Sequence, residues 1–511
     1  MTGAEAVLRT AAAAGVDVCF ANPGTTEMAL VNALDREPRI RAVLGLFEGV
    51  CSGAADGYAR MAGRPALTLL HLGPGLANAL ANLHNARRAR SPVVNLVGDQ
   101  ATWHRGADAP LTSDIASIAR PVSTWLRETR ETATIAQDTA EAIAAAQKPP
   151  GGVATLILPA DCQAGEVRGL AEPIPPAAAA RPVAHQIERV AAALRREQNA
   201  GIFLGGRALS VRAQLAAGRV ARATGCRLFS ETFPARFERG AGLPRVDRLP
   251  YFPDWATSYL EGMRLLVLAA TREPVAFFGY PGSPSRLSPA GCEVLTLAAP
   301  DEDVEGALEA LADAIGAPAY TPMTLARPEL PDGDWNPQAV GAVLAAVQPE
   351  GAIVVDESAT TGVGYFEAAA AAPRHSFLTL TGGSIGMGPP CSVGAAIACP
   401  ERTVINFQGD GGAMYTVQAL WTQARVQLHV VTLICANRSY RILQIESARA
   451  GVQPGPKALS LTELGRPPLD WVHLAGAMGV PATRVESVES LRRALSVALA
   501  EPGPHLIEAV V

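Results

Sequence analysis

The sequence predicts an α/β protein made of three doubly wound parallel-sheet domains. Apolar runs of strand length alternate with helical patterns along the whole chain, and two proline-rich stretches interrupt this alternation. In addition, 511 residues are too many for one ordinary hydrophobic core. We therefore expect three domains of similar size, at residues 1–165, 184–315 and 335–511.

The first third begins with a helix expected near residues 4–14. Two later segments, Val50–Met61 and Leu76–Arg88, have helical spacing and are rich in Ala and Leu. Between the helices lie apolar runs that predict buried parallel strands, because both faces of such strands are covered. These strands are Val16–Ala21, Ala66–Leu72, Val93–Val97 and Ala154–Leu158.

The stretch Glu166–Val183 contains several prolines and an Ala run, so we expect a linker there. The second block has expected strands at Ile202–Leu204, Arg227–Ser230, Leu265–Ala269, Val275–Phe278 and Glu293–Leu297. A second Pro-rich stretch, Ala317–Pro337, separates it from the last third. There the expected strands are Ala352–Val355, Ser376–Leu380, Thr403–Phe407, His429–Ile434 and His505–Val510.

The composition is that of a globular protein, with 49% hydrophobic and 18% charged residues. With 43 basic and 48 acidic residues, the net charge of −5 gives no reason to expect nucleic acid or an anionic membrane as a partner. The eight cysteines are scattered, without a C-x-x-C pair, and are expected to be small buried hydrophobes in a reducing compartment. No apolar stretch reaches the length of a membrane span and no leader is recognisable, so we expect a cytoplasmic enzyme.

The strongest chemical motif lies in the last third. The strand Thr403–Phe407 runs into Gln408-Gly409-Asp410-Gly411-Gly412, a helix is expected from about Met414 to Arg425, and the strand His429–Ile434 leads to Asn437. A glycine-rich turn before a helix offers backbone N–H groups to phosphate. Asp410 and Asn437 add the oxygen ligands that magnesium prefers. Gly-Asp-Gly alone is more often a surface turn, but both polar groups stand at the carboxyl ends of strands, where α/β folds bind ligands.

On these motifs the sequence resembles the thiamine-diphosphate-dependent decarboxylase and carboligase family, which includes acetolactate synthase, benzoylformate decarboxylase and pyruvate oxidase. The resemblance implies a pyrimidine-binding, a central and a diphosphate-binding domain, with thiamine diphosphate and Mg²⁺ as cofactors. It implies that Asp410, Asn437 and the backbone carbonyl of Ser439 are the magnesium ligands. Family members often have two adjacent asparagines, and this chain has Ala436 at the first, less critical position.

The resemblance also predicts a catalytic glutamate near residue 50, and Glu48 stands there in Leu46-Phe47-Glu48-Gly49. Its implied role is to hydrogen-bond the pyrimidine ring and promote the imino tautomer, which takes the proton from the thiazolium carbon. The structural alternative is a carboxylate favoured in the first turn of a helix. Together with the metal motif, catalysis is the preferred interpretation.

Two more segments resemble the substrate side of benzoylformate decarboxylase, where a hydroxyl residue and a histidine face the substrate. The matching positions are Thr25, in Asn22-Pro23-Gly24-Thr25-Thr26-Glu27, and His71, in Leu70-His71-Leu72-Gly73-Pro74-Gly75. A lone histidine at a strand end is usually structural, yet imidazole moves protons well near neutral pH. Gln100 matches a glutamine common in the synthases.

The segment Thr381–Gly386 resembles the loop that holds the cofactor bent, and Asp356–Thr361 matches a segment that contacts the diphosphate. Gly383 would offer its carbonyl to the aminopyrimidine, and Ile385 would lie between the two rings. FAD is not expected, because Gly205-Gly206 follows a strand without the spaced third glycine of a dinucleotide loop. The implied cofactor-binding residues are Pro23, Glu48, Asn78, Ala359, Thr360, Gly383, Ile385, Gly409, Asp410, Gly411, Gly412, Asn437, Ser439 and Tyr440.

Three functions remain open at this stage. The preferred one is decarboxylation of a 2-oxo acid followed by carboligation to an aldehyde or a second 2-oxo acid, as in acetolactate synthase; Phe47-Glu48-Gly49 and Gln100 favour it. The alternative is a lyase that releases an aldehyde, which His71 and Thr25 favour. A non-catalytic cofactor-binding paralogue is disfavoured by the retained Glu48 and Asp410.

The family resemblance also implies an assembly. In the family, the pyrimidine-side domain of one subunit faces the diphosphate-side domain of another. We therefore expect a homodimer or homotetramer in which Glu48 and Asp410 of different chains serve one cofactor.

Overall fold

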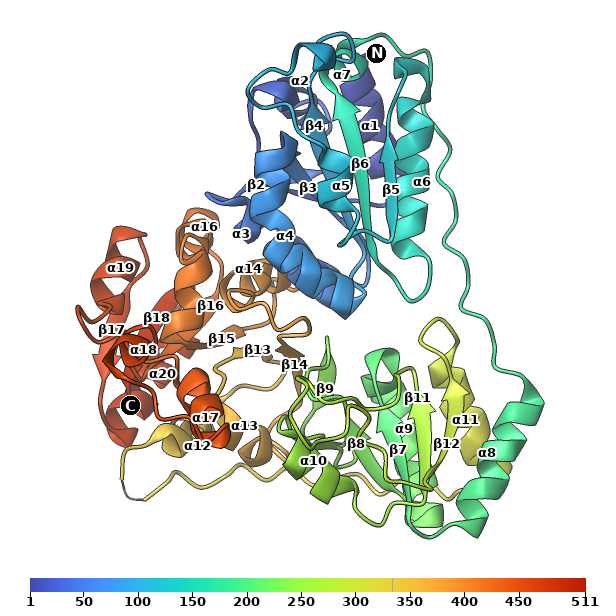
Figure 1. Ribbon diagram of the computed structural model, residues 1–511, viewed down its shortest axis with the longest axis vertical. Helices are drawn as coiled ribbons and strands as arrows, with labels where there is room; N and C mark the ends of the chain where they lie inside the picture. Colours follow the sequence, from blue (N-terminus) through green and yellow to red (C-terminus); the bar gives the residue numbers. More distant parts are fainter. Residues whose placement is uncertain (333) are drawn as a thin grey trace. The chain divides into compact units, whose positions relative to one another are not determined.

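The computed structural model describes residues 1–332 and 334–511, and the chain divides into two compact units (Figure 1). The first unit comprises Met1–Ala177, Pro328–Ala369 and Thr379–Val511, and the second comprises Ala178–Arg327 and Ala370–Leu378. Three sheets dominated by parallel pairs, with helices between the strands, confirm the α/β prediction. The domain boundaries at 165, 184, 315 and 335 stay a prediction, and residue 333 of the expected boundary stretch 317–337 lies outside the described residues.

The N-terminal part of the first unit is built on a six-stranded sheet with the order β2-β1-β3-β4-β6-β5, in which every neighbouring pair is parallel. The four interior strands were all expected from their apolar runs. The two edge strands, β2 and β5, were not, because they are only partly buried and lack a continuous apolar run. The strands are β1 (Val18–Asn22), β2 (Arg41–Leu44), β3 (Ala66–His71), β4 (Val93–Asp99), β5 (Trp125–Glu128) and β6 (Val153–Pro159).

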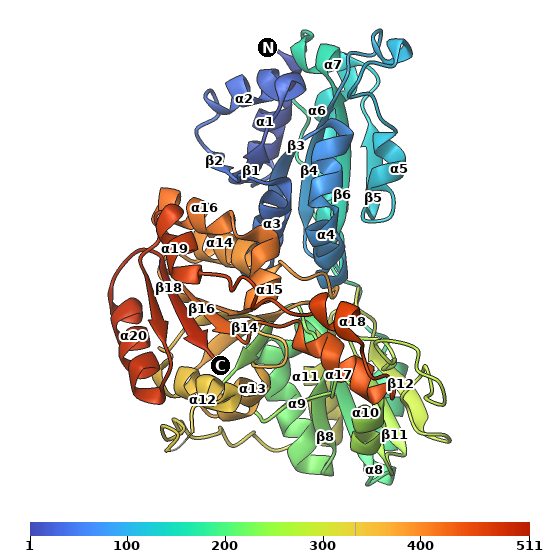
Figure 2. The same ribbon diagram turned by 60° about the vertical axis from the view of Figure 1, so that its left-hand side comes forward.

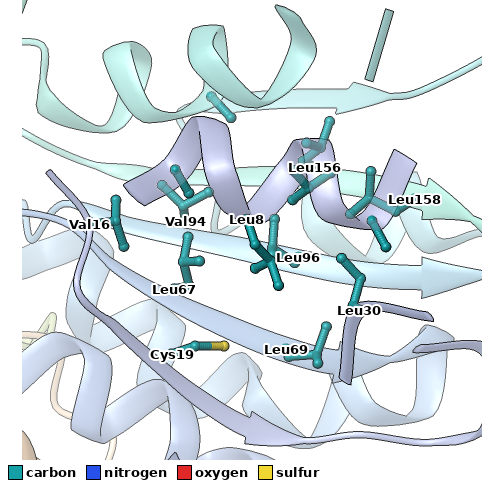
Figure 3. Packing of buried hydrophobic residues seen from close by; sticks show 14 of the residues in the cluster. Leu8, Val16, Cys19, Leu30, Leu67, Leu69, Val94, Leu96, Leu156 and Leu158 are labelled. Atoms are coloured by element: carbon teal, nitrogen blue, oxygen red, sulfur yellow. The ribbon is translucent and has the colours of Figure 1, made fainter. Parts of the chain in front are cut away.

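Helices cover both faces of this sheet, with α1 and α2 on one side and α4 and α5 on the other (Figure 2). On the α1 side, alternate residues of the strands form a core with leucines from α1 and α2 (Figure 3). Each fully buried leucine contributes about 1.5–3 kcal/mol. The helices are α1 (Gly3–Ala13), α2 (Met28–Leu34), α3 (Glu48–Ala62), α4 (Leu72–Ala89), α5 (Ile115–Ala119), α6 (Ile135–Gln147) and α7 (Ala160–Ala164).

The C-terminal part of the first unit contains five parallel strands in the order β17-β18-β16-β15-β13. They are β13 (Ile353–Glu357), β15 (Val404–Gly409), β16 (Val430–Ala436), β17 (Ala482–Val485) and β18 (His505–Val510). The helices are α12 (Pro337–Val347), α13 (Val363–Ala368), α14 (Gly388–Ala398), α15 (Asp410–Ala413), α16 (Ala419–Val426), α17 (Arg441–Arg449), α18 (Pro456–Ser460), α19 (Trp471–Ala477) and α20 (Val488–Ala500).

The helix expected from Met414 to Arg425 differs from the observed one. Helical structure begins already at Asp410 in α15, and a 3-10 turn at Met414–Thr416 separates it from α16. Gly409 is the N-cap and Asp410 the first residue of α15, and the Asp410 carboxylate accepts the N–H of Gly411, one of the free N–H groups of the first turn, at 2.9 Å. The aspartate of the motif therefore stands in the first turn of the helix.

Helices α3 and α14 meet backbone to backbone inside the first unit. A Cβ on Gly394 would lie 1.8 Å from the carbonyl oxygen of Ala54, and one on Gly57 would lie 2.0 Å from that of Cys391. Only glycine permits this approach. The contact joins the helix that begins at Glu48 to the helix that follows the loop containing Gly383 and Ile385.

The second unit contains the sheet β10-β8-β7-β11-β12, and a short antiparallel pair of β9 with β14. The strands are β7 (Ala200–Leu204), β8 (Arg227–Ser230), β9 (Phe237–Arg239), β10 (Asp247–Arg248), β11 (Leu265–Ala269), β12 (Glu293–Ala298) and β14 (His375–Thr379). Its helices are α8 (Ala184–Arg196), α9 (Val211–Thr224), α10 (Pro253–Leu260) and α11 (Val304–Ile315).

The strand expected at Val275–Phe278 is wrong. Val275 makes only an isolated bridge with Arg286, and its side chain is 64% exposed. Phe277 packs edge-on against Phe233 and Phe278 instead of entering the sheet. The aromatic residues of this run pack against other aromatic rings outside the sheet. A short apolar run in the sequence does not distinguish such a loop from a buried strand.

All eight cysteines are free, and six of them are buried. This agrees with their interpretation as small apolar residues. In the part of the chain that the structure describes, none of the helices has the length and apolar character needed to cross a membrane.

Candidate active site

The expected site residues of the N-terminal part lie at the carboxyl edge of the six-stranded sheet. Pro23 and Thr25 follow β1, His71 is the last residue of β3, and Gln100 follows β4. Glu48 opens α3, a few residues after β2 ends. Because parallel strands end at the same edge, residues far apart in sequence are brought to one place.

Glu48 and His71 both lie close to Gly75 in α4. A Cβ on Gly75 would be 3.2 Å from Glu48 Oε1 and 3.3 Å from His71 Cβ. Asn78, one turn further along α4, donates from Nδ2 to Glu48 Oε2 at 2.9 Å. Glu48 is half-buried and Asn78 is exposed, so the carboxylate is oriented and still accessible.

His71 is held by two residues of the segment after β1. Its Nδ1 lies 2.8 Å from Glu27 Oε2 and 3.3 Å from Thr26 Oγ1. The next residue, Leu72, is fully buried with φ of 44°, a left-handed conformation that costs a non-glycine residue on the order of 1–2 kcal/mol. The backbone at the end of β3 is therefore bent sharply where the imidazole projects.

The hydroxyl beside His71 belongs to Thr26 and not to Thr25. Thr25 is exposed at the start of a 3-10 turn, so its substrate-facing role stays a prediction. Gln100 is half-buried, and its N–H donates to Asp99 Oδ1 at 2.7 Å. Asp99 in turn pairs with Arg105 at 2.6 Å.

The expected magnesium ligands Asp410 and Asn437 follow two adjacent parallel strands, β15 and β16. Asp410 Oδ2 accepts the N–H of Arg438 at 2.7 Å, which brings the residue after Asn437 directly onto the carboxylate. Burial raises the pKa of Asp410 above its ordinary value, while the N–H groups of Arg438 and Gly411 act in the opposite direction. A cation beside this carboxylate would offset the cost of its burial.

The donor set fits a hard cation. Asn437 has an amide oxygen, and Ser439, two residues further along the chain, has a backbone carbonyl. The hydroxyl of Ser439 is buried and has no hydrogen-bond partner among the described residues. One carboxylate, one amide and a carbonyl, completed by diphosphate and water, is a magnesium environment. Among the described residues, neither this site nor any other brings together three His, Cys, Asp or Glu side chains.

The glycines of the motif make room for neighbouring side chains. A Cβ on Gly411 would lie 2.4 Å from Cε1 of Tyr440, so the tyrosine ring lies against the motif. A Cβ on Gly412 would lie 3.9 Å from Cβ of Ile385. Tyr440 and Ile385, both expected from the family resemblance, thus lie next to the Asp410 segment.

The loop at residues 381–388 is fixed by a buried carboxylate at the end of β13. Glu357 accepts the N–H of Gly386 at 2.5 Å and that of Gly388 at 2.6 Å. Burial raises the pKa of Glu357 to about 7, although the two backbone N–H groups lower it. On the other side, Asn85 of α4 donates to the carbonyl of Ser384 at 2.7 Å.

Ala359 and Thr360, in the expected diphosphate segment, follow β13. Ala359 is exposed with φ of 51°, and Arg438, beside Asn437, has φ of 54°. Together with Leu72, three of the non-glycine residues in the left-handed region thus lie at expected site segments. Strain of this kind concentrates at functional sites, where the surrounding structure enforces it.

The two groups of residues remain separate clusters within one chain. Glu48, Asn78 and His71 form one, and Asp410 and Asn437 belong to the other. Across residues 1–332 and 334–511, no hydrogen bond or ion pair joins a member of one cluster directly to a member of the other. The family's assembly of one site from two chains stays a prediction.

Sequence reasoning did not assign a role to Glu27 or Glu357. Glu27 stands three residues after Gly24 and accepts its N–H at 2.7 Å, which is the spacing of a capping interaction and could have been noticed. Glu357 is an acidic residue at the end of an apolar run, and this position also suggests a carboxylate at the edge of a sheet.

Comparison with known proteins identifies the class. The N-terminal thiamine pyrophosphate binding domain of thiamine pyrophosphate enzymes matches residues 1–118, and the C-terminal thiamine pyrophosphate binding domain matches residues 362–509. These ranges contain the two clusters described above. The chain belongs to the thiamine pyrophosphate enzyme family that includes acetolactate synthase large subunits and benzoylformate decarboxylases.

Individual relatives span the full length of the chain. It is 53% identical to "Putative acetolactate synthase large subunit IlvX" of Mycobacterium tuberculosis, covering 100% of this chain and 99% of that one. It is 30% identical to benzoylformate decarboxylase of Pseudomonas aeruginosa, covering 97% and 96%. The solved structure of the thiamine diphosphate-dependent 4-hydroxybenzoylformate decarboxylase of Rhodococcus jostii RHA1 is similar with a TM-score of 0.87 and 27% identity, covering 99% and 98%.

Proposed function

We propose that this protein binds thiamine diphosphate through Mg²⁺ and decarboxylates a 2-oxo acid, releasing the remaining fragment as an aldehyde. The observation that carries the proposal is the cluster at the carboxyl edge of the first sheet. There an oriented carboxylate, Glu48, and a histidine, His71, both lie next to Gly75, and the His71 ring is held by Glu27 and Thr26. Such a pair of proton-handling groups suits chemistry in which a proton is removed at one stage and delivered at another.

Asp410, Asn437 and the carbonyl of Ser439 would hold Mg²⁺, and Ala359, Thr360 and the glycines at 409, 411 and 412 would line the diphosphate. When bound, thiamine diphosphate supplies the nucleophilic carbon and the electron sink for loss of carbon dioxide. Ile385 and the Gly383 carbonyl would hold the cofactor bent. Glu48 would bind the pyrimidine ring and exchange a proton with it, oriented by Asn78.

Protonated at Nε2, His71 would steady the substrate carboxylate and then deliver that proton to complete the aldehyde. This role separates the lyase from its main rival. In a carboligase the fragment joins a second carbonyl compound, and the relative named as an acetolactate synthase, which is 53% identical, supports that second candidate. The two relatives named as decarboxylases and the geometry around His71 support the lyase.

The direct test is a product assay on the purified protein. It should be incubated with thiamine diphosphate and MgCl₂ and with pyruvate, benzoylformate or 4-hydroxybenzoylformate, each with and without an added acceptor aldehyde. We expect carbon dioxide release that needs both cofactors, with aldehyde as the main product. Predominantly ligated product would favour the carboligase, and no carbon dioxide from any 2-oxo acid would contradict both proposals.

A variant at His71 tests the assignment of the outcome. His71→Ala should bind the cofactor normally, lose most of the activity and change the ratio of aldehyde to ligated product. If both the activity per cofactor-loaded site and the product ratio match those of the wild type, then His71 has a structural role only.

A further inference from the structure

We propose that Glu27 is a positioning residue that fixes the His71 ring as its Nδ1–H tautomer, so that Nε2 is the atom that exchanges protons with the substrate. The inference rests on the substrate-side role proposed for His71. It concerns a residue to which neither the sequence motifs nor the family resemblance assigned a role.

The first observation is the burial of the Glu27 carboxylate. The residue is 0% exposed, and a buried carboxylate is costly unless hydrogen bonds satisfy it. Three polar groups contact it. Oε2 accepts the N–H of Gly24 at 2.7 Å and is 2.8 Å from His71 Nδ1, while Oε1 accepts the hydroxyl of Thr26 at 2.5 Å.

The donors and acceptors around His71 Nδ1 determine the tautomer of the ring. Thr26 has one hydroxyl proton, and that proton is directed to Glu27 Oε1. Both oxygens near His71 Nδ1, those of Glu27 and Thr26, therefore act as acceptors toward it. Nδ1 must carry a hydrogen. No hydrogen bond from the described residues reaches Nε2, and the side chain is 20% exposed, which leaves Nε2 open to a substrate.

The backbone around the pair is shaped to fit it. A Cβ on Gly98 in β4 would lie 1.7 Å from Glu27 Oε1, and one on Gly24 would lie 2.2 Å from His71 Nδ1. Gly24 and Gly98 thus leave space for the Glu27–His71 pair, and the left-handed backbone of Leu72 follows directly after His71. In His-dependent chemistry a carboxylate on the second ring nitrogen orients the ring and selects which nitrogen can act.

A purely structural alternative exists, because Glu27 also closes the turn at residues 24–27 through the Gly24 N–H. In that case its loss would lower stability and leave the ring state of His71 unchanged. The test must therefore measure the ring directly. Glu37 provides a matched control, since it is 4% exposed in the same part of the chain and pairs with Arg39 at 2.7 Å, away from His71.

The experiment compares Glu27→Ala, Glu27→Gln and Glu37→Ala by long-range ¹⁵N–¹H correlation spectra of ¹⁵N-histidine-labelled protein, with His71 assigned from His71→Gln. In Glu27→Ala, the freed Thr26 hydroxyl can donate to Nδ1, so we expect a change to the Nε2–H form. Decarboxylation should fall roughly 10- to 100-fold in kcat with little change in KM. In Glu27→Gln, the Gly24 N–H should select the amide oxygen, and not the amide nitrogen, at the position of Glu27 Oε2. His71 Nδ1 then still faces an acceptor, so the Nδ1–H form and most of the wild-type rate should be kept.

Glu37→Ala should change neither the ring state nor kcat. The proposal is overturned if Glu27→Ala retains the Nδ1–H form, or if Glu27→Ala and Glu37→Ala reduce kcat equally. Should Glu27→Ala fail to fold, Gly24→Ala moves the ring off the carboxylate, because its Cβ would lie 2.2 Å from His71 Nδ1, and loss of this acceptor should remove the preference for the Nδ1–H form. The spectra need no substrate, so a wild type without decarboxylase activity would contradict the proposed function while the link between Glu27 and His71 is still decided.

Discussion

Three carboxylates that lie at or after the ends of strands are buried. They are Glu27, a few residues after β1, Glu357, the last residue of β13, and Asp410, the residue after β15. Each is less than a tenth exposed. In every case backbone N–H groups approach the carboxylate. Burying a charge is unfavourable, and these hydrogen bonds offset part of that cost, although burial still raises the pKa of Glu357 and of Asp410.

Cofactor binding should depend on the carboxylate of Asp410, because the diphosphate would reach the protein through the metal. Asp410→Ala should reduce affinity for thiamine diphosphate in the presence of Mg²⁺ by roughly 100-fold or more while the protein stays folded, measured by calorimetric titration and circular dichroism. Asp470→Ala is the control, since Asp470 also accepts a backbone N–H at a helix start, that of His473, but lies outside both clusters. Unchanged affinity in Asp410→Ala would exclude it as a metal ligand.

Glu357 should make stability depend on pH. Its pKa is raised by burial to about 7 from an ordinary value of 4.5. The protonated form is favoured by folding, so this stabilisation is complete below the ordinary value and is lost as pH rises through about 7, by on the order of 3 kcal/mol.

Glu357→Gln cannot ionise and should lack this dependence, although its amide also opposes one backbone N–H and lowers stability equally at every pH. Thermal unfolding of both proteins between pH 4.5 and pH 8, a range chosen about these pKa values, should show a Tm difference that narrows as pH rises. Parallel curves would show that Glu357 does not titrate in this range.

At the scale of elements, the crossing of α3 and α14 couples the two halves of the first unit. Glu48 begins α3, and the loop at residues 381–388 leads into α14. The same loop is held by Asn85 of α4 and by Glu357 after β13. The crossing therefore lies between the helix that begins at Glu48 and a loop expected to bind the cofactor.

Gly394→Ala tests this crossing. The new Cβ would lie 1.8 Å from the carbonyl oxygen of Ala54, so the helices must separate, and the free energy of unfolding should fall by about 1–3 kcal/mol in urea denaturation. Gly476→Ala in α19, where nothing lies within 4 Å of the new Cβ, should be neutral or slightly stabilising. Equal stability of the two variants would mean that the contact is not close in solution.

At the scale of the whole molecule, the question is whether one cofactor is served by two chains. The Glu48 cluster and the Asp410 cluster lie on different sheets of the first unit. The family resemblance pairs each with its counterpart from a partner chain. A homodimer built in this way has two equivalent sites.

Mixed dimers of two inactive variants test whether one site is built from two chains. Glu48→Gln should bind cofactor and lose roughly 100-fold or more of its turnover, and Asp410→Ala should be inactive. If the site is shared, co-refolding equal amounts of the two variants gives dimers with one intact site, and about a quarter of wild-type activity should return. No recovery, with mixed dimers verified by differential tags, would show that Glu48 and Asp410 of the same chain act together.

Most strands that the sequence did not predict lie at sheet edges, although the edge strand β12 was expected and is present. Interior strands such as β3, β4 and β16 are covered on both faces and read as continuous apolar runs. Edge strands β2, β5, β10 and β17 are partly exposed and carry charged residues, so no such run marks them. The aromatic run at residues 275–278 shows the converse, an apolar signal without a strand.

By itself, the sequence determined the α/β class, the interior strands and the family, because periodicity and short motifs are local properties of the chain. It did not reveal that Thr26 is the threonine that contacts His71, or that Glu27 orients the ring. Those facts depend on contacts between residues 44 and 45 positions apart. Only the tertiary structure decides them, since the ends of parallel strands meet where the sheet, and not the chain, brings them together.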